Sequence, residues 1–117
     1  YEIVSTGYNS FPRGINDNIE ERQERPEKYY WIEHAERNAI YNAARIGVSL
    51  RESTMYLTCG IPCSDCAKGI ISSGIKRIHC KIKDTTRNRE YWDEHAKRSL
   101  QMFKESGVEV IFYNDNV

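Results

Sequence analysis

Apolar residues recur at helical spacing in three stretches of this chain. Residues 35–46 are rich in alanine, their apolar positions lie three and four apart, and Gly47 follows as a left-handed stop. Residues 63–73 and 91–106 show similar helical character, and each of these stretches is also followed directly by glycine. The pattern predicts three helices, each ended by a glycine.

Short stretches rich in β-branched and aromatic residues lie before and between these helices. They predict strands over residues 2–8, 54–59, 77–82 and 108–113, the first from a weak alternation of polar and apolar positions. A charged run over residues 17–28 predicts a solvated loop. Strands therefore alternate with helices, and a helix of about four turns separates the last two strands. We expect an α/β layered domain whose last two strands are parallel.

Length and charge narrow the class of protein. A chain of 117 residues suits a single domain over residues 1–117. Lys plus Arg equal Asp plus Glu at 17 each, so we expect a small-molecule partner and no nucleic acid. The sequence has no run of 18 apolar residues and does not begin like a signal peptide. We therefore expect a soluble, cytoplasmic protein with no membrane partner.

Two short motifs open the first two predicted helices: His-Ala-Glu at residues 34–36 and Pro-Cys-Ser-Asp-Cys at residues 62–66. The free amides and the dipole at a helix N-terminus favour negative charge, so both thiols should bind a cation as thiolates. His34, Cys63 and Cys66 would then give zinc three protein ligands and leave its fourth position to water, as in catalytic sites. Glu36 is suited to take a proton from that water.

The cysteine pair alone leaves other interpretations open, because this spacing also occurs in redox motifs and in structural zinc sites. The upstream histidine and glutamate favour the catalytic site. We expect Cys59 and Cys80 to be small buried residues on strands, with Cys59 as a less favoured fourth ligand.

Two further histidines and an aromatic cluster have both structural and functional interpretations. In a predicted strand, His79 is favoured as a structural residue over a ligand. His95 falls in a charged helix, and we expect it to face solvent. The aromatic residues 29–31 precede the first helix, where packing is favoured over base stacking.

The layout H-x-E followed by P-C-x-x-C is typical of zinc-dependent nucleobase deaminases. The chain also resembles the deoxycytidylate deaminase family at residues 7–14, 34–40 and 69–76, which look like its Gly-Tyr-Asn loop and its two zinc helices. The resemblance implies a three-layer α/β/α cytidine deaminase-like sandwich with a mixed sheet. It implies zinc-dependent hydrolytic deamination of dCMP to dUMP and ammonia, by a homo-oligomer of two or six copies.

The same resemblance implies four substrate contacts. Asn9 would bind the deoxyribose, and the backbone amide of Ala35 would meet the base carbonyl. Tyr91 would line the pocket, and Arg13 would approach the phosphate. A deaminase of another cytosine nucleotide, free base or nucleic acid remains an alternative, as does a zinc-stabilised module without activity.

The chain also departs from the family that it resembles. Many members carry an N-terminal helix and a strand ahead of the segment that begins here at Tyr1, and that strand pairs between two others. Its omission would expose two rows of backbone groups, so we expect an upstream segment that is absent from this sequence or supplied by another chain. The loop over residues 17–27 differs from that of nucleotide-regulated members, which argues against allosteric control.

Overall fold

A three-stranded sheet lies at the centre of the fold. The computed structural model describes residues 2–82 and 89–114, with residues 89–93 as backbone only. β1 (Thr54–Tyr56), β2 (Arg77–Lys81) and β3 (Glu109–Tyr113) lie in that order, and both pairings are parallel. The three strands predicted here are confirmed, each slightly shorter than expected, as is the parallel pairing of the last two.

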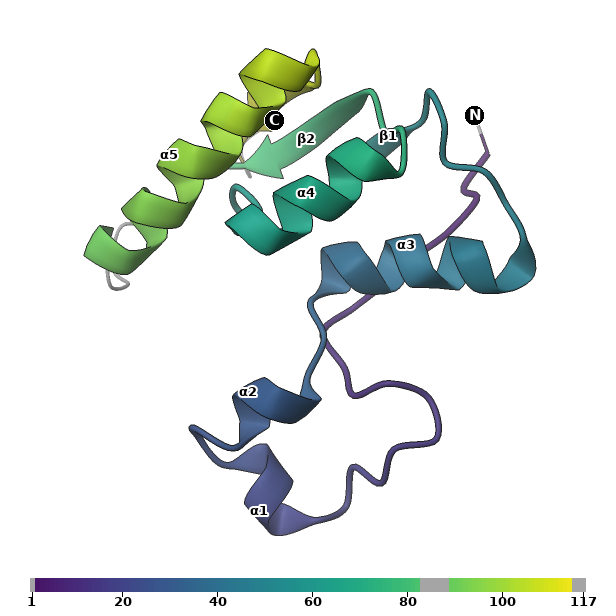
Figure 1. Ribbon diagram of the computed structural model, residues 1–117, viewed down its shortest axis with the longest axis vertical. Helices are drawn as coiled ribbons and strands as arrows, with labels where there is room; N and C mark the ends of the chain where they lie inside the picture. Colours follow the sequence, from purple (N-terminus) through teal and green to yellow (C-terminus); the bar gives the residue numbers. More distant parts are fainter. Residues whose placement is uncertain (1, 83–88, 115–117) are drawn as a thin grey trace.

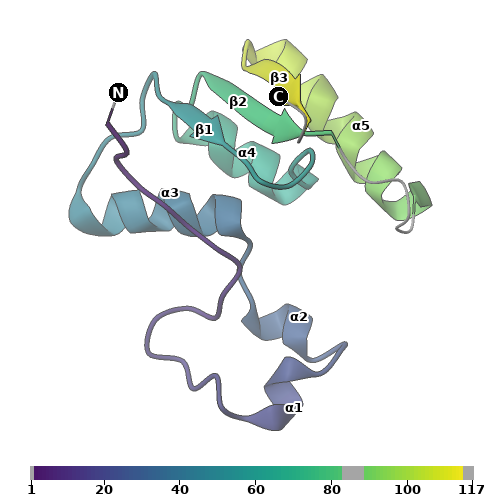
Figure 2. The ribbon, with the colours of Figure 1, turned by 180° about the vertical axis from the view of Figure 1, so that it is seen from behind.

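Three helices pack on this sheet and against each other. They are α3 (Ala35–Ile46), α4 (Ser64–Ser72) and α5 (Arg89–Ser106), close to the predicted bounds. α4 and α5 lie over one face of the sheet, and α3 packs beside α4 (Figure 1). From behind, the strands lie in front of the helices (Figure 2). Within the residues described, helices thus cover one face of the three-stranded sheet, and both strand pairings of this sheet are parallel. The second helical layer and the antiparallel pairing of the expected sandwich are not formed by this part of the chain.

The hydrophobic core lies between the sheet and its helices. Successive strand residues point to opposite faces, so Ile78 and Cys80 of β2 are buried, as expected for Cys80. On the other face His79 stacks on Tyr56, with ring centroids 4.6 Å apart, a contact of the kind expected of a structural histidine. The core residues come from every layer: Leu57, Ala67, Ile70, Ile75, Ile78, Cys80, Phe103 and Val108.

The strand predicted over residues 2–8 does not form. This segment runs along α3 (Figures 1 and 2) and bonds to that helix instead. Ser5 Oγ donates to the Ala39 carbonyl at 2.7 Å, and Asn42 Nδ2 donates to the Thr6 carbonyl at 2.8 Å. A strand needs a neighbouring strand to satisfy its backbone, and none lies beside this segment among the residues described. Polar side chains of α3 instead satisfy part of the backbone of this segment.

Residues 11–32 form a lobe beyond α3 (Figure 1). The lobe is joined to the body by an antiparallel bridge between Ser10 and Glu33. The loop predicted over residues 17–28 is wrong in part, because the four-residue helix α1 (Glu20–Gln23) forms within it. A second four-residue helix, α2 (Lys28–Trp31), begins where the predicted loop ends. Both are mostly exposed, as expected of a charged run.

The aromatic residues of α2 lie on the surface of this lobe. Tyr29 and Tyr30 are 61 % and 82 % exposed, so the predicted packing is wrong for both. The Trp31 ring lies 4.0 Å from the Arg22 guanidinium, and its Nε1 donates to Glu27 at 3.0 Å. The lobe is therefore held by polar and cation–π contacts more than by a core. No helix among the residues described is long and apolar enough to span a bilayer.

Candidate metal centre

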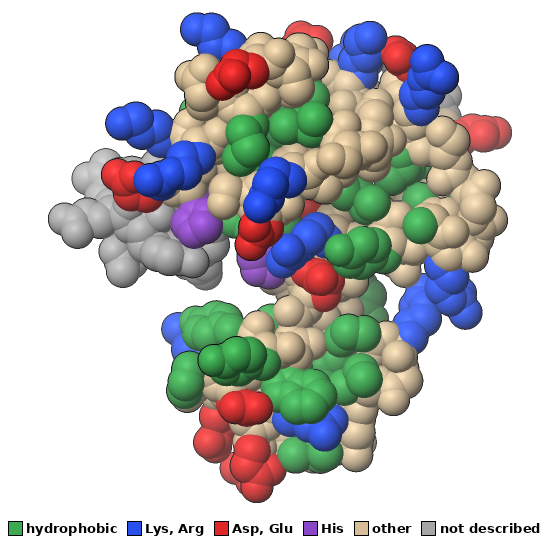
Figure 3. All heavy atoms as spheres, viewed as in Figure 1, with side chains coloured by type: hydrophobic (Ala, Val, Ile, Leu, Met, Phe, Trp, Pro, Cys, Tyr) green, Lys and Arg blue, Asp and Glu red, His purple; other side chains and the backbone are tan. Residues whose placement is uncertain are grey.

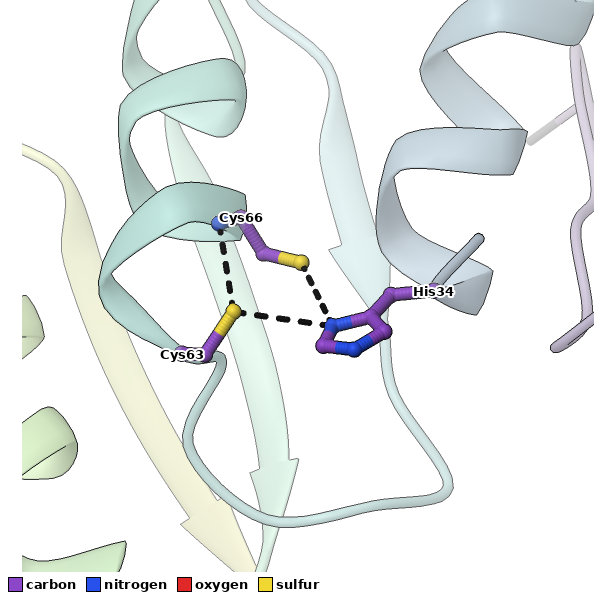
Figure 4. A group of neighbouring side chains, drawn as sticks. All are labelled: His34, Cys63 and Cys66. Atoms are coloured by element: carbon purple, nitrogen blue, oxygen red, sulfur yellow. Dashed lines mark hydrogen bonds between the residues drawn. The ribbon is translucent and has the colours of Figure 1, made fainter. Parts of the chain in front are cut away.

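Two helix N-termini converge on one cluster of side chains. His34 is the N-cap of α3, Cys63 is the N-cap of α4, and Cys66 lies in the first turn of α4. The three side chains point toward one another (Figure 4). His34 Nδ1 lies 3.3 Å from Cys66 Sγ and 3.5 Å from Cys63 Sγ, and the possible ligand atoms all lie within 4.8 Å of one another. The structure therefore brings the three predicted ligands together.

The pKa values of the two thiols shift in opposite directions because the two side chains are hydrogen-bonded to each other. The pKa of Cys63 falls to about 3, because the Cys66 side chain and His34 donate to its sulfur and the Cys66 amide adds a weaker bond at 3.5 Å. The pKa of Cys66 is raised by its hydrogen bond to Cys63 and by burial. The pKa of His34 is raised by its hydrogen bond to Cys63. Cys63 is thus the natural thiolate, and Cys66 would need a nearby cation to join it.

This donor set fits a zinc ion. Two sulfurs and one imidazole nitrogen are ligands that zinc prefers, and a divalent cation would offset the cost of two thiolates side by side. All four cysteines are free thiols, so no disulfide joins Cys63 to Cys66. Cys59 is exposed, contrary to its predicted burial, and does not belong to the cluster. The cluster therefore offers three ligands among the residues described.

Glu36 lies in the first turn of α3, two residues after the ligand His34. Glu36 is buried, with 7 % of its surface exposed, although most residues of α3 are partly or fully exposed. After the hydrogen bond to Cys63 and burial, the Glu36 charge is the next cause of the raised pKa of Cys66. Glu36 is therefore a buried acidic residue in the turn that begins at the ligand His34, and its role in proton transfer stays a prediction.

The predicted substrate contacts Asn9 and Ala35 meet each other at the N-terminus of α3. The Ala35 amide donates to Asn9 Oδ1 at 2.8 Å. The loop that carries Asn9 is anchored by Asn38, whose Nδ2 donates to the Tyr8 carbonyl at 2.9 Å. Both residues thus lie directly beside the ligand His34.

Arg13 contacts α3 away from the cluster. Arg13 donates to Asn42 Oδ1 at 2.9 Å, and Asn42 lies about two turns, or ~12 Å, along α3 from His34. The side chain of Tyr91 lies outside the described part of the chain. Their roles stay predictions.

Two residues of α5 reach the site, and the sequence did not single them out for it. His95 was expected to face solvent, but it is half-buried. Its Nδ1 lies 3.3 Å from the Ser64 amide nitrogen. Ser99 is fully buried, and its Oγ donates to the Pro62 carbonyl at 2.7 Å. The available signal was a histidine and a serine four residues apart on one helix, a spacing that puts them on the same side.

Comparisons with known proteins place these features in one family. Residues 1–82 match the family model described as the cytidine and deoxycytidylate deaminase zinc-binding region. An uncharacterized deaminase in the luxG 3′ region of Aliivibrio fischeri is 38 % identical over 108 residues, which cover 92 % of this chain and 69 % of that protein. The deoxycytidylate deaminase of Enterobacteria phage T4 is 44 % identical over 78 residues, which cover 66 % of this chain. The match spans only 35 % of the phage protein.

A solved structure supports the fold. The dCMP deaminase of the cyanophage S-TIM5, crystallised in complex with dCMP and dUMP, superposes with a TM-score of 0.70 at 24 % identity. The match covers 96 % of this chain and 74 % of that one. The cytidine deaminase-like α/β fold expected from the sequence is therefore confirmed.

Proposed function

The chain belongs to the family of cytidine and deoxycytidylate deaminases that share this zinc-binding region, and on that premise we propose that it hydrolyses deoxycytidylate to deoxyuridylate and ammonia. Zinc is its cofactor, held in this proposal by His34, Cys63 and Cys66. In the reaction, water adds to C4 of cytosine, the bond from C4 to the exocyclic nitrogen breaks, and a carbonyl remains.

One observation supports the proposal: three possible metal ligands converge, and a buried glutamate follows one of them by two residues. A purely structural zinc site is usually closed by a fourth protein ligand, and the cluster offers three. A glutamate that is only 7 % exposed is costly to bury, which fits a functional role better than a structural one.

When bound, zinc supplies the Lewis acidity that brings the pKa of water towards neutrality. In this proposal the carboxylate of Glu36 accepts a proton from the attacking water and delivers it to N3 of the base, and it then carries the remaining hydroxyl proton to the exocyclic nitrogen, which leaves as ammonia while the C4 carbonyl forms. Glu36 therefore acts as general base and then as general acid.

The N-terminus of α3 would recognise the nucleotide. The Ala35 amide would donate to the base carbonyl and Asn9 would bind the sugar, as the family resemblance implies. These two groups are bonded to each other at 2.8 Å, so either contact requires an exchange of this hydrogen bond for one to the substrate. Arg13 and Tyr91 remain predicted contacts to the phosphate and the pocket wall. A homo-oligomer and a cytoplasmic location likewise stay predictions.

The proposal is tested by ammonia release from purified, zinc-loaded protein. The panel is cytosine, cytidine, deoxycytidine, CMP, dCMP, dCTP and a cytosine-containing single-stranded DNA. We expect the highest kcat/KM on dCMP. Higher activity on another compound would reassign the substrate, and zinc binding without turnover on any of them would favour the non-catalytic module.

A further inference from the structure

We propose that His95 and Ser99 of α5 are positioning residues that hold the zinc ligand Cys63 from both sides. The inference rests on the proposed function, because it assigns these residues to the same metal site. Neither residue touches the three ligand side chains in any contact described above. Both act on the backbone that carries Cys63.

Ser99 holds the residue before the ligand. Its Oγ donates to the Pro62 carbonyl at 2.7 Å, a short bond between two fully buried residues. Among the residues described, Ser99 and Glu36 are the only buried polar or charged side chains. A buried hydroxyl is tolerated when it is hydrogen-bonded, and this bond joins α5 to the loop that leads into α4.

His95 holds the residue after the ligand. Its Nδ1 lies 3.3 Å from the Ser64 amide nitrogen and 3.2 Å from Ser64 Oγ. A backbone amide can only donate, so Nδ1 accepts and the imidazole proton lies on Nε2. This bond satisfies one of the free amides at the N-terminus of α4.

The two anchors act together because they lie four residues apart on α5 and therefore face the same way. Ser99 donates to the carbonyl that precedes Cys63, and His95 accepts from the amide that follows it. Between them Cys63 has an extended backbone (φ −64°, ψ 167°) as the N-cap of α4. Its sulfur is thereby aimed at His34, with Sγ 3.5 Å from Nδ1. Outer groups that orient metal ligands commonly change affinity by about 10- to 100-fold when they are removed.

The test compares His95→Leu, which removes the acceptor, with His95→Asn, whose side-chain oxygen can accept in place of Nδ1. His79→Leu is the matched control, since that histidine stacks on Tyr56 away from the helices. Zinc affinity is measured by competition with a chelator, and ligand geometry by the absorption bands of the cobalt-substituted protein. We expect His95→Leu to weaken zinc binding by about 10- to 100-fold and shift the cobalt bands. His95→Asn and His79→Leu should stay close to wild type.

A second pair tests the other anchor independently of whether the first folds well. Ser99→Ala removes the bond to Pro62, and Ser106→Ala removes a comparable serine bond to a carbonyl, that of Phe103 at 3.2 Å. We expect weaker zinc binding in Ser99→Ala alone. Equal affinity for His95→Leu and His95→Asn, or for Ser99→Ala and Ser106→Ala, would overturn the assignment of that anchor.

The proposal and the proposed function fail in different ways. If the wild-type chain binds zinc but deaminates no cytosine compound, the enzymatic activity is refuted while the affinity measurements still decide the roles of His95 and Ser99. If the wild-type chain binds no zinc, both are refuted.

Discussion

The two helix N-termini that meet at the metal centre are held in different ways. At the start of α4, the Cys63 sulfur accepts from a backbone amide of the same helix. The backbone groups just before and just after Cys63 are hydrogen-bonded to Ser99 and His95 of α5, and this region is mostly buried. At the start of α3, His34 makes no side-chain capping bond, and the Ala35 amide donates to Asn9, an exposed residue of a distant loop. One end is fixed, and the other is closed by a contact that can be exchanged.

This difference suits the two tasks proposed for the site. A metal ligand gains from a backbone that cannot move, because misplaced ligands cost affinity. A substrate contact gains from a donor whose present partner can be released.

Figure 3 shows acidic, basic and histidine side chains gathered where the body faces the lobe, on the side of the molecule seen in Figure 1.

Acidic residues at equivalent positions sharpen the comparison. Glu36 is the second residue of α3, and Asp65 is the second residue of α4. Glu36 is buried, whereas the Asp65 side chain is 60 % exposed and pairs with Lys68 at 3.0 Å. The pKa of Asp65 is lowered by its hydrogen bond to Lys68. Position on a helix alone therefore does not make a carboxylate catalytic.

The largest effect is expected at this pair of carboxylates. Glu36→Gln should reduce dCMP turnover by about 10²- to 10⁴-fold, because the amide cannot carry the proton. Zinc content and the free energy of unfolding should stay near wild type. Asp65→Asn is the matched control and should keep its turnover, with a change in stability within about 0.5 kcal/mol for the exposed ion pair. Comparable losses in both variants would contradict the role assigned to Glu36.

A smaller effect is expected where the N-terminal segment packs on α3. A Cβ at Gly7 would lie 2.4 Å from the Ala39 nitrogen, so Gly7→Ala should force the segment away and destabilise the fold by about 1–3 kcal/mol. At Gly69 of α4 a Cβ would meet only side-chain atoms at ordinary contact distance, Ile40 Cδ1 at 3.5 Å and Arg37 Cγ at 3.8 Å. Gly69→Ala should therefore stabilise its helix, by about 0.5–1 kcal/mol. Urea unfolding of both variants measures the contrast, and a neutral Gly7→Ala would refute the close packing.

The smallest effect is expected at the exchangeable contact itself. Asn9→Ala leaves the Ala35 amide without its acceptor and should cost about 1 kcal/mol, as the loss of a helix cap does. Asn16→Ala is the control, because Asn16 Oδ1 also accepts from a backbone amide, that of Asn18, but in the lobe. The proposed role in sugar binding adds a rise in KM for dCMP in Asn9→Ala alone. An unchanged KM would leave Asn9 a purely structural residue.

Local signals predicted the helices and the metal ligands well. An alanine-rich run that stops at Gly47 defines α3 without help from the rest of the fold. The two motifs lie at helix starts, so their side chains were already expected to share an electrostatic environment. The strand over residues 2–8 failed because alternation predicts an extended backbone but supplies no partner strand.

Other features depend on contacts between distant parts of the chain. The histidine at position 95 looked solvent-facing because its helix is charged, and its bond to Ser64 spans 31 positions. Burial of Cys59 was predicted from its residue type, but the strand ends at Tyr56 and leaves it exposed. Periodicity within one segment carries no information on which segments meet. Such residues can be assigned only once the helices are packed.

The span between the ligands gives the metal a second consequence. His34 and Cys63 lie 29 positions apart, so a shared ion ties the two ends of one chain segment that contains all of α3 and all of β1. Holding the ends of such a loop together offsets about 3 kcal/mol of chain entropy. The ion therefore acts as a reversible cross-link as well as a reagent, and zinc scarcity would weaken the architecture together with the chemistry.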